Sequence, residues 1–149
     1  IMNLNSKTIS QFTIDNIIYD KSKDKFTYID WRESFGGITN GGDLYYDLAK
    51  LNHSFIVNHK KVDQKKFSLF ARGNKIVVNI ERRADLVRSQ KLFYKFLREN
   101  NYSIYVVNIL TSLIFLNIAT LHHSPYREFL YYLGLDCLNK SIKNHQIIL

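Results

Sequence analysis

The chain has 149 residues, with 46% hydrophobic and 14% aromatic content and a formal charge of +8. This length fits one domain, so we expect residues 1–149 to fold as a unit, and the many apolar side chains exclude a disordered chain. A single cysteine, Cys137, excludes an intrachain disulfide and favours a reducing, cytoplasmic location. The opening lacks the pattern of a signal peptide. The first residue, Ile1, is consistent with a chain that begins inside a longer protein.

A short hairpin is predicted near the N-terminus. Residues 16–20 and 25–30 are β-prone and flank a polar turn at residues 21–24. Gly36-Gly37 and Gly41-Gly42 then bracket a loop, because clustered glycines disfavour regular elements. After this loop Asp43 is placed to cap a helix. The inner stripe of that helix is predicted to contain Leu44, Asp47, Leu48, Leu51 and Phe55.

The second half of the chain predicts another hairpin followed by three helices. Residues 66–72 and 75–81 flank Gly73-Asn74, a two-residue turn signal. A last helix is expected from Ser124-Pro125 to about Asn139, with the proline in the first turn. The fold class is therefore predicted as α+β, mainly helical, with two small hairpins and about four helices. On the first of these three helices, at residues 85–99, the predicted inner residues are Leu86, Leu92, Phe93, Phe96 and Leu97.

Residues 101–126 contain no charged side chain. Their length suits a membrane span of about 20 residues. Polar residues interrupt the apolar run, however, and helices that are apolar on most sides also occur at the centre of compact domains. We therefore expect a buried core helix and no membrane span. The interrupting residues are Asn108, Thr111, Ser112, Asn117 and Thr120.

The positive charge is concentrated in residues 59–66 and in Arg82-Arg83 with Arg88 and Lys91. A basic balance attracts nucleic acids, anionic lipids or phosphorylated small molecules without choosing among them. Neither cluster is a long basic run, and no nucleic-acid-binding signature accompanies them. We interpret both as solvated surface and expect no nucleic-acid partner.

Asn16 and Asp30 stand at the two ends of the first predicted hairpin. An antiparallel hairpin brings such ends together, so an amide oxygen and a carboxylate would converge there. Mg²⁺ prefers oxygen ligands and completes its shell with water and substrate phosphates. The pair therefore predicts a phosphoryl-transfer metal site, although Asn and Asp at hairpin ends are also common turn formers.

The motifs around this pair resemble the C-terminal lobe of protein-kinase-like phosphotransferases of the aminoglycoside phosphotransferase and choline kinase type. Asn16 matches the family's metal-binding Asn, and Ile29-Asp30-Trp31 matches its metal-binding Asp segment. The segment Gly42-Asp43-Leu44-Tyr45-Tyr46-Asp47-Leu48-Ala49 matches the later Gly-Asp-x-x-Tyr-Asp-Leu-Ala motif. The resemblance covers roughly residues 11–135, and it is strongest to the variant associated with bacterial capsule and surface-polysaccharide clusters.

The resemblance implies a site as well as a fold. Asn16 and Asp30 would hold Mg²⁺ and ATP, Asp43 would cap its helix and brace the catalytic loop, and Asp47 would fix the glycine-rich segment. The acceptor would be the hydroxyl of a small sugar or amino alcohol. Residues 12–54 would form the metal-binding hairpin, glycine loop and following helix, and residues 66–139 the second hairpin and helical core. Candidate residues of the substrate pocket are Trp31, Arg32 and Phe35. In the alternative interpretation, these side chains pack against the core or face solvent.

Two departures from the family pattern predict that the chain alone is inactive. The position of the catalytic Asp, five residues before Asn16, is Gln11, and a neutral amide cannot act as the base. About ten residues precede the motif, so the N-terminal lobe with its phosphate loop and lysine is expected to be missing or separately encoded. The alternative is a non-catalytic, pseudokinase-like binding or regulatory module.

The histidines lack the i, i+4 spacing of a helical metal pair. We therefore expect surface histidines or hydrogen-bonded core histidines at the four positions considered, which are His53, His59, His122 and His123.

Overall fold

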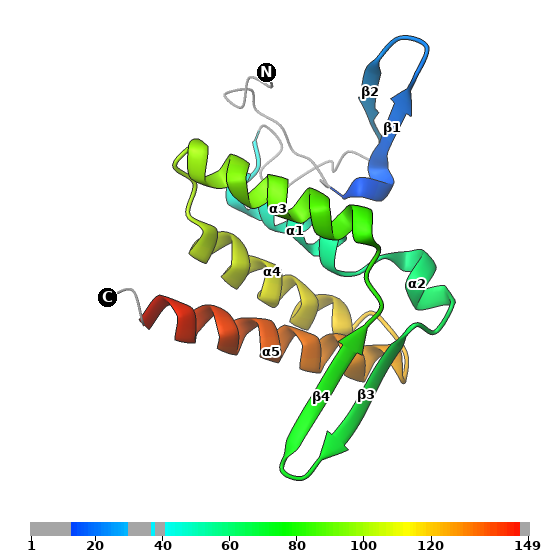
Figure 1. Cartoon of the computed structure of the whole chain (residues 1–149), viewed down its shortest axis with the longest axis vertical. Coiled ribbons are helices and arrows are strands. Elements are labelled where there is room, and N and C mark those ends of the chain that lie inside the picture. Colours follow the sequence, from blue (N-terminus) through cyan, green and yellow to red (C-terminus); the bar gives the residue numbers. More distant parts are fainter. Residues whose placement is uncertain (1–12, 30–36, 38–40, 147–149) are drawn as a thin grey trace.

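The computed structural model describes residues 13–29, 37 and 41–146, and it is a stack of helices with two projecting hairpins (Figure 1). The long helices are α1 (Leu44–Ile56), α3 (Ala84–Glu99), α4 (Ile104–Ala119) and α5 (Tyr126–Gln146); α2 (His59–Asp63) is short. The strands are β1 (Ile17–Asp20), β2 (Lys25–Tyr28), β3 (Phe67–Arg72) and β4 (Lys75–Ile80), and a 3-10 turn, η1 (Ile14–Asn16), precedes β1. The predicted class, α+β and mainly helical, is confirmed.

Both predicted hairpins are present as two-stranded antiparallel sheets. In the second, Arg72 pairs with Lys75 around Gly73, whose φ of +58° is the left-handed conformation that a tight turn requires. In the first, Ile17 pairs with Tyr28. The first hairpin is shorter than predicted at its open end, because Asn16 belongs to η1 and not to the strand.

Helix α3 packs on α1 through a single narrow face. Leu86, Phe93 and Leu97 are buried there together with Leu48 and Phe55 of α1. The prediction was wrong for two other α3 residues: Leu92 is 63% exposed, and Phe96 is also exposed. Positions i, i+7 and i+11 share one side of a helix, whereas neighbouring residues are turned by about 100° from one another.

Helix α4 lies between α1 and α5, so the prediction of a buried core helix is confirmed (Figure 1). Phe115 of α4 packs with Phe129 and Leu130 of α5 in a second core cluster. The two helices approach closely at Gly134, where an added Cβ would lie 2.9 Å from the Leu116 side chain.

Helix α5 continues past the predicted end near Asn139 to Gln146. No glycine or proline follows Asn139 to stop it. The Lys140 ammonium pairs with the Asp136 carboxylate one turn earlier, at 2.6 Å, which supports the helix across the predicted end.

Candidate functional site

Asn16, the first predicted metal ligand, lies at the base of the β1–β2 hairpin. Beyond the Ile17–Tyr28 pair, the Ile29 amide donates to the Asn16 carbonyl oxygen at 2.9 Å. The two segments therefore stay paired as far as Asn16 and Ile29, and Asp30 is the next residue in the sequence. Asp30 itself lies outside the described residues.

The turn η1 attaches Asn16 to the helical body. The Ile14 amide donates to Oγ of Ser54 in α1 at 3.4 Å, and the Ile14 side chain packs against the α1–α3 core. One residue later, Oδ2 of Asp15 lies 3.6 Å from Nε2 of His59. These contacts hold the base of the hairpin against α1 and α2.

Asp43 caps α1, as predicted. Its backbone is extended, and its Oδ1 accepts a hydrogen bond from the Tyr46 amide at 2.8 Å. Asp47 is buried in the first turn of α1, where a carboxylate also interacts favourably with the helix dipole. The role of Asp47 in fixing the glycine-rich segment stays a prediction.

Replacing Asp43 with alanine is expected to lower the free energy of unfolding by about 1 kcal/mol, because an N-terminal amide of α1 loses its acceptor. Asp43→Asn is the matched control, since asparagine caps about as well as aspartate. Urea denaturation of both variants checks this. Equal losses in the two variants would contradict a purely capping role.

The remaining predicted site residues lie outside the described part of the chain. Between them and α1, Gly37 adopts φ of +85°, a left-handed conformation that favours glycine, in agreement with a loop here. The catalytic-position, metal and pocket residues concerned are Gln11, Asp30, Trp31, Arg32 and Phe35.

Sequence reasoning missed a chain of polar side chains that crosses the core. Nη2 of Arg82 donates to Oε1 of Gln90 at 2.7 Å, and Nε2 of Gln90 donates to Oδ1 of Asn52 at 2.8 Å. Nδ2 of Asn52 then donates to Oγ1 of Thr111 at 3.0 Å. Asn52 is only 1% exposed, so these bonds replace all of its contact with water.

Arg82 sets the direction of every bond in this chain, because a guanidinium only donates. The oxygen of Gln90 must face it, so the amide nitrogen of Gln90 donates onward and Asn52 accepts. Oδ1 of Asn108 accepts from Asn52 at 3.4 Å and from the Tyr94 hydroxyl at 2.9 Å. Burial raises the pKa of Tyr94, which keeps this hydroxyl a donor at neutral pH.

The sequence contained a partial signal for this network. Asn108 and Thr111 are among the polar residues that interrupt the apolar helix, and from the sequence alone they argue only against a membrane span. Asn52 and Gln90 carry no local signal, because their partners lie at sequence separations of 59 and 38 residues.

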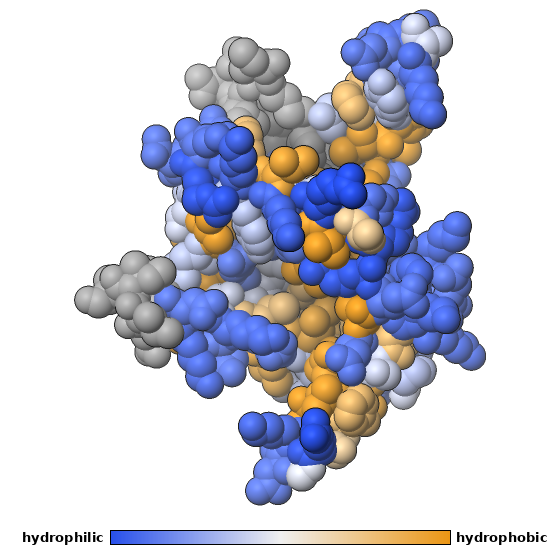
Figure 2. All heavy atoms as spheres, in the orientation of Figure 1, coloured by the Kyte–Doolittle hydropathy of each residue, from blue (hydrophilic) through white to orange (hydrophobic). Residues whose placement is uncertain are grey.

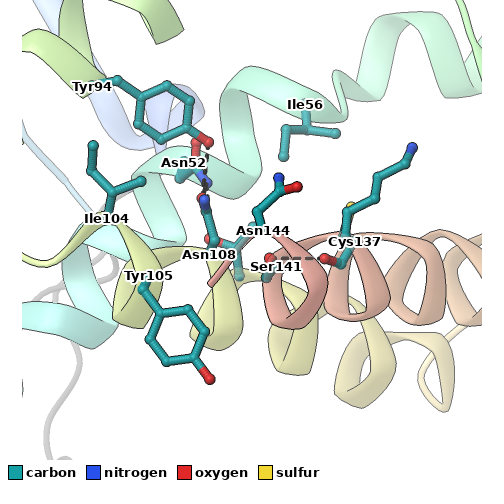
Figure 3. Close-up of a pocket in the computed structure, with 11 residues that line it drawn as sticks. Asn52, Ile56, Tyr94, Ile104, Tyr105, Asn108, Cys137, Ser141 and Asn144 are labelled. Atoms are coloured by element: carbon teal, nitrogen blue, oxygen red, sulfur yellow. Dashed lines mark hydrogen bonds between the residues drawn. The ribbon is translucent and has the colours of Figure 1, made fainter. Parts of the chain in front are cut away.

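A cavity of about 420 Å³ opens beside the network, between α1, α3, α4 and the C-terminal half of α5 (Figure 3). Figure 2 shows the surface recessed between the hydrophilic side chains over α3 and those over this half of α5. This volume lies within the range of small-molecule sites. Its lining includes Asn52, Tyr94, Asn108, Ile56, Cys137 and Asn144.

His53 corrects one expectation of the sequence. It is a core residue, 7% exposed, but neither ring nitrogen has a hydrogen-bond partner among the described residues. Its ring packs on Phe115, with centroids 4.8 Å apart. Burial, with a smaller contribution from Lys50 and His59, lowers the pKa of His53 to about 3. The histidine is therefore held neutral in an apolar setting.

No family model matches this chain, and no curated protein or solved structure matches it either. Within residues 13–29, 37 and 41–146, no group of three or more His, Cys, Asp or Glu side chains is placed to hold a metal ion. None of the helices described there has the length and apolar character needed to cross a bilayer.

Proposed function

We propose that this chain is the C-terminal lobe of a protein-kinase-like phosphotransferase that holds magnesium and ATP through Asn16 and Asp30. The observation that carries the proposal is the pairing of Asn16 with Ile29 at the base of the β1–β2 hairpin. It brings Asn16 and Ile29 to the same end of one ribbon, and Asp30 is the next residue in the sequence.

The donor set suits the proposed ion. Asn16 and Asp30 offer an amide oxygen and a carboxylate, which are hard ligands of the kind that Mg²⁺ takes alongside substrate phosphates. When bound, the ion would supply neutralising charge for the phosphates. The chain's own part is to hold Asn16 in place, through the contacts of η1 with Ser54 and His59.

The acceptor in this proposal is a hydroxyl of a small sugar or amino alcohol, with Trp31, Arg32 and Phe35 as candidate pocket residues. The motifs belong to one lobe only, so catalysis also requires a phosphate-binding N-terminal lobe, from the same or a separate polypeptide. Gln11 stands at the position of the base and cannot accept a proton as a carboxylate does. The chain alone is therefore expected to bind nucleotide without turnover.

Isothermal titration calorimetry with ATP, in the presence and absence of Mg²⁺, tests the proposal. Asn16→Ala and Asp30→Ala are each expected to weaken Mg²⁺-dependent binding by about tenfold or more, since each removes a charge-assisted or polar ligand contact. Asn74→Ala and Asp63→Ala, in the other hairpin and in α2, are the matched controls and should bind as the wild type does.

Two results would contradict this assignment. One is a folded wild-type chain that does not bind ATP with Mg²⁺. The other is ATP turnover that survives Gln11→Ala but is lost in Asp30→Ala, because Gln11 would then not occupy the position of the base.

The second candidate is a non-catalytic module that pairs with a separately encoded partner. The β1–β2 hairpin favours it, because the hairpin projects from the body and leaves the stacked rings of Tyr19 and Phe26 45% and 57% exposed on one face (Figure 1). Exposed apolar side chains of this kind mark contact surfaces when they cluster. Mg²⁺-dependent ATP binding that stays without turnover after a complete N-terminal lobe is supplied and Gln11 is replaced by aspartate would favour this candidate.

A further inference from the structure

The cavity beside the polar network is separate from the residues assigned to phosphoryl transfer. On α1, Asn52 and Ile56 face the cavity, whereas Ser54 contacts η1, the turn that contains Asn16. Positions 52 and 54 are turned by about 200° from one another on a helix. The cavity therefore lies on the side of α1 that faces away from Asn16.

The hydrogen bonds of the network fix the orientation of one side-chain amide in the cavity lining, that of Asn108. Oδ1 of Asn108 already accepts from both Tyr94 and Asn52. Within the described part of the chain, Nδ2 of Asn108 makes no hydrogen bond. It is not fully buried either, and because Asn108 lines the cavity, we infer that Nδ2 is accessible from the cavity. It presents N–H donors that are oriented before any ligand arrives.

The α5 side of the cavity adds groups of mixed character. The Ser141 hydroxyl donates to the Cys137 carbonyl oxygen at 2.8 Å, so its lone pairs are left to accept. Asn144 contributes an amide that both donates and accepts (Figure 3). A hydroxyl group also donates and accepts, and it matches this mixture better than a group that does only one.

The charge of the lining disfavours strongly ionic ligands. Among the described residues that line the cavity there is no carboxylate, and the cation among them, Lys140, is paired with Asp136 at 2.6 Å. Burial raises the pKa of Cys137 to about 11, so the thiol is neutral as well. A cationic ligand would lose water here without gaining an opposite charge, which is costly, and an anionic ligand would have to compete with Asp136 for Lys140.

We propose that this cavity binds an uncharged small molecule with several hydroxyl groups, such as a neutral sugar or a cyclic polyol. The fixed N–H donors of Asn108 and the mixed groups of α5 would hold the hydroxyls, and Ile56, Ile104 and Cys137 would cover the C–H faces of the ring. Amphipathic rings of this kind need both polar and apolar contacts. The site does not depend on the phosphotransfer proposal.

Saturation-transfer NMR on the full chain tests this with D-glucose, D-galactose and myo-inositol as neutral probes. Glucuronate and glucosamine are the anionic and cationic counterparts of the hexose. At least one neutral probe is expected to bind saturably, and about tenfold more tightly than either charged counterpart, since an unpaired charge is disfavoured in this lining.

Three variants locate the binding. Asn144→Trp fills the cavity from an exposed position and should abolish binding, whereas Lys143→Trp, on the adjacent residue of α5, should not change it. Asn108→Asp keeps an acceptor for Tyr94 and Asn52 but replaces the free donor, and should weaken binding about tenfold. Unchanged amide spectra outside the cavity serve as the check on folding.

The proposal fails if none of the three neutral probes binds. It fails equally if binding is unaffected by Asn144→Trp, or if glucuronate or glucosamine binds more tightly than every neutral probe. Retention of sugar binding in Asn16→Ala, together with loss of ATP binding there, would separate this site from the phosphotransfer proposal.

Discussion

Replacing Asn52 with leucine is expected to lower the free energy of unfolding by about 3 kcal/mol. The side chain is almost fully buried and takes part in bonds to Gln90 and Thr111 at 2.8 and 3.0 Å. Leucine has a similar size but removes the acceptor at 2.8 Å from the Gln90 amide, which keeps only the longer bond to the Tyr94 hydroxyl at 3.5 Å, and it also leaves Thr111 without its donor. Each unsatisfied buried group costs about 1–3 kcal/mol. The substitution also removes the bond from Asn52 to Asn108, so the side chain of Asn108 is no longer held in one orientation by both of its partners.

Urea denaturation at pH 7 measures this effect. Asn117→Leu is the matched control, because Asn117 is an exposed asparagine on α4 and its replacement is expected to change stability by no more than about 0.5 kcal/mol. A second variant, Asn52→Leu with Gln90→Leu, removes both ends of one bond and should cost less than the sum of the single changes. Strict additivity would show that the two side chains do not interact.

His53 is expected to make the protein less stable in mild acid. Its pKa is about 3 in the folded chain and 6.5 as an unperturbed side chain, so the unfolded state binds more protons between these values. The contribution of neutral His53 to the free energy of unfolding is fully present above pH 6.5 and decreases as the pH falls toward 3. At pH 5 the loss amounts to about 2 kcal/mol, since one pKa unit corresponds to about 1.4 kcal/mol.

His53→Leu is expected to reduce the difference in unfolding free energy between pH 7 and pH 5 by that amount. At pH 7 the variant should be at least as stable as the wild type, because the two unpartnered ring nitrogens are removed from the core. His123→Gln is the control, since His123 is exposed and does not contribute to the pKa of His53. If His53→Leu keeps the full pH dependence of the wild type, His53 is not the responsible group.

Most of the secondary structure was predictable from local chemistry. Gly73-Asn74 specifies a tight turn whatever surrounds it, and Asp43 caps α1 through an amide only three residues away. The apolar run of α4 predicted a core helix, because this signal also lies within the segment itself. The inner face of α3 was only partly predictable, because Phe93 and Leu92 are equally apolar and only the position of α1 selects between them.

The candidate metal site was predictable to the level of the hairpin. The strand pairing brings the base of the ribbon together as expected, up to Asn16 and Ile29. The polar network and the cavity were not predictable. Asn52, Gln90 and Asn108 are ordinary helix residues in the sequence, and they meet only when three helices pack.

The amino-acid sequence by itself determined where the chain turns, where α1 begins and which segments bury an apolar face. Those choices depend on residues a few positions apart, whose interactions form in any compact state of the chain. The tertiary structure alone decided that Asn52 joins Thr111, that His53 stays neutral beside Phe115, and that a neutral cavity opens along α5. These features depend on desolvation and on contacts between distant segments, which exist only after the helices have packed.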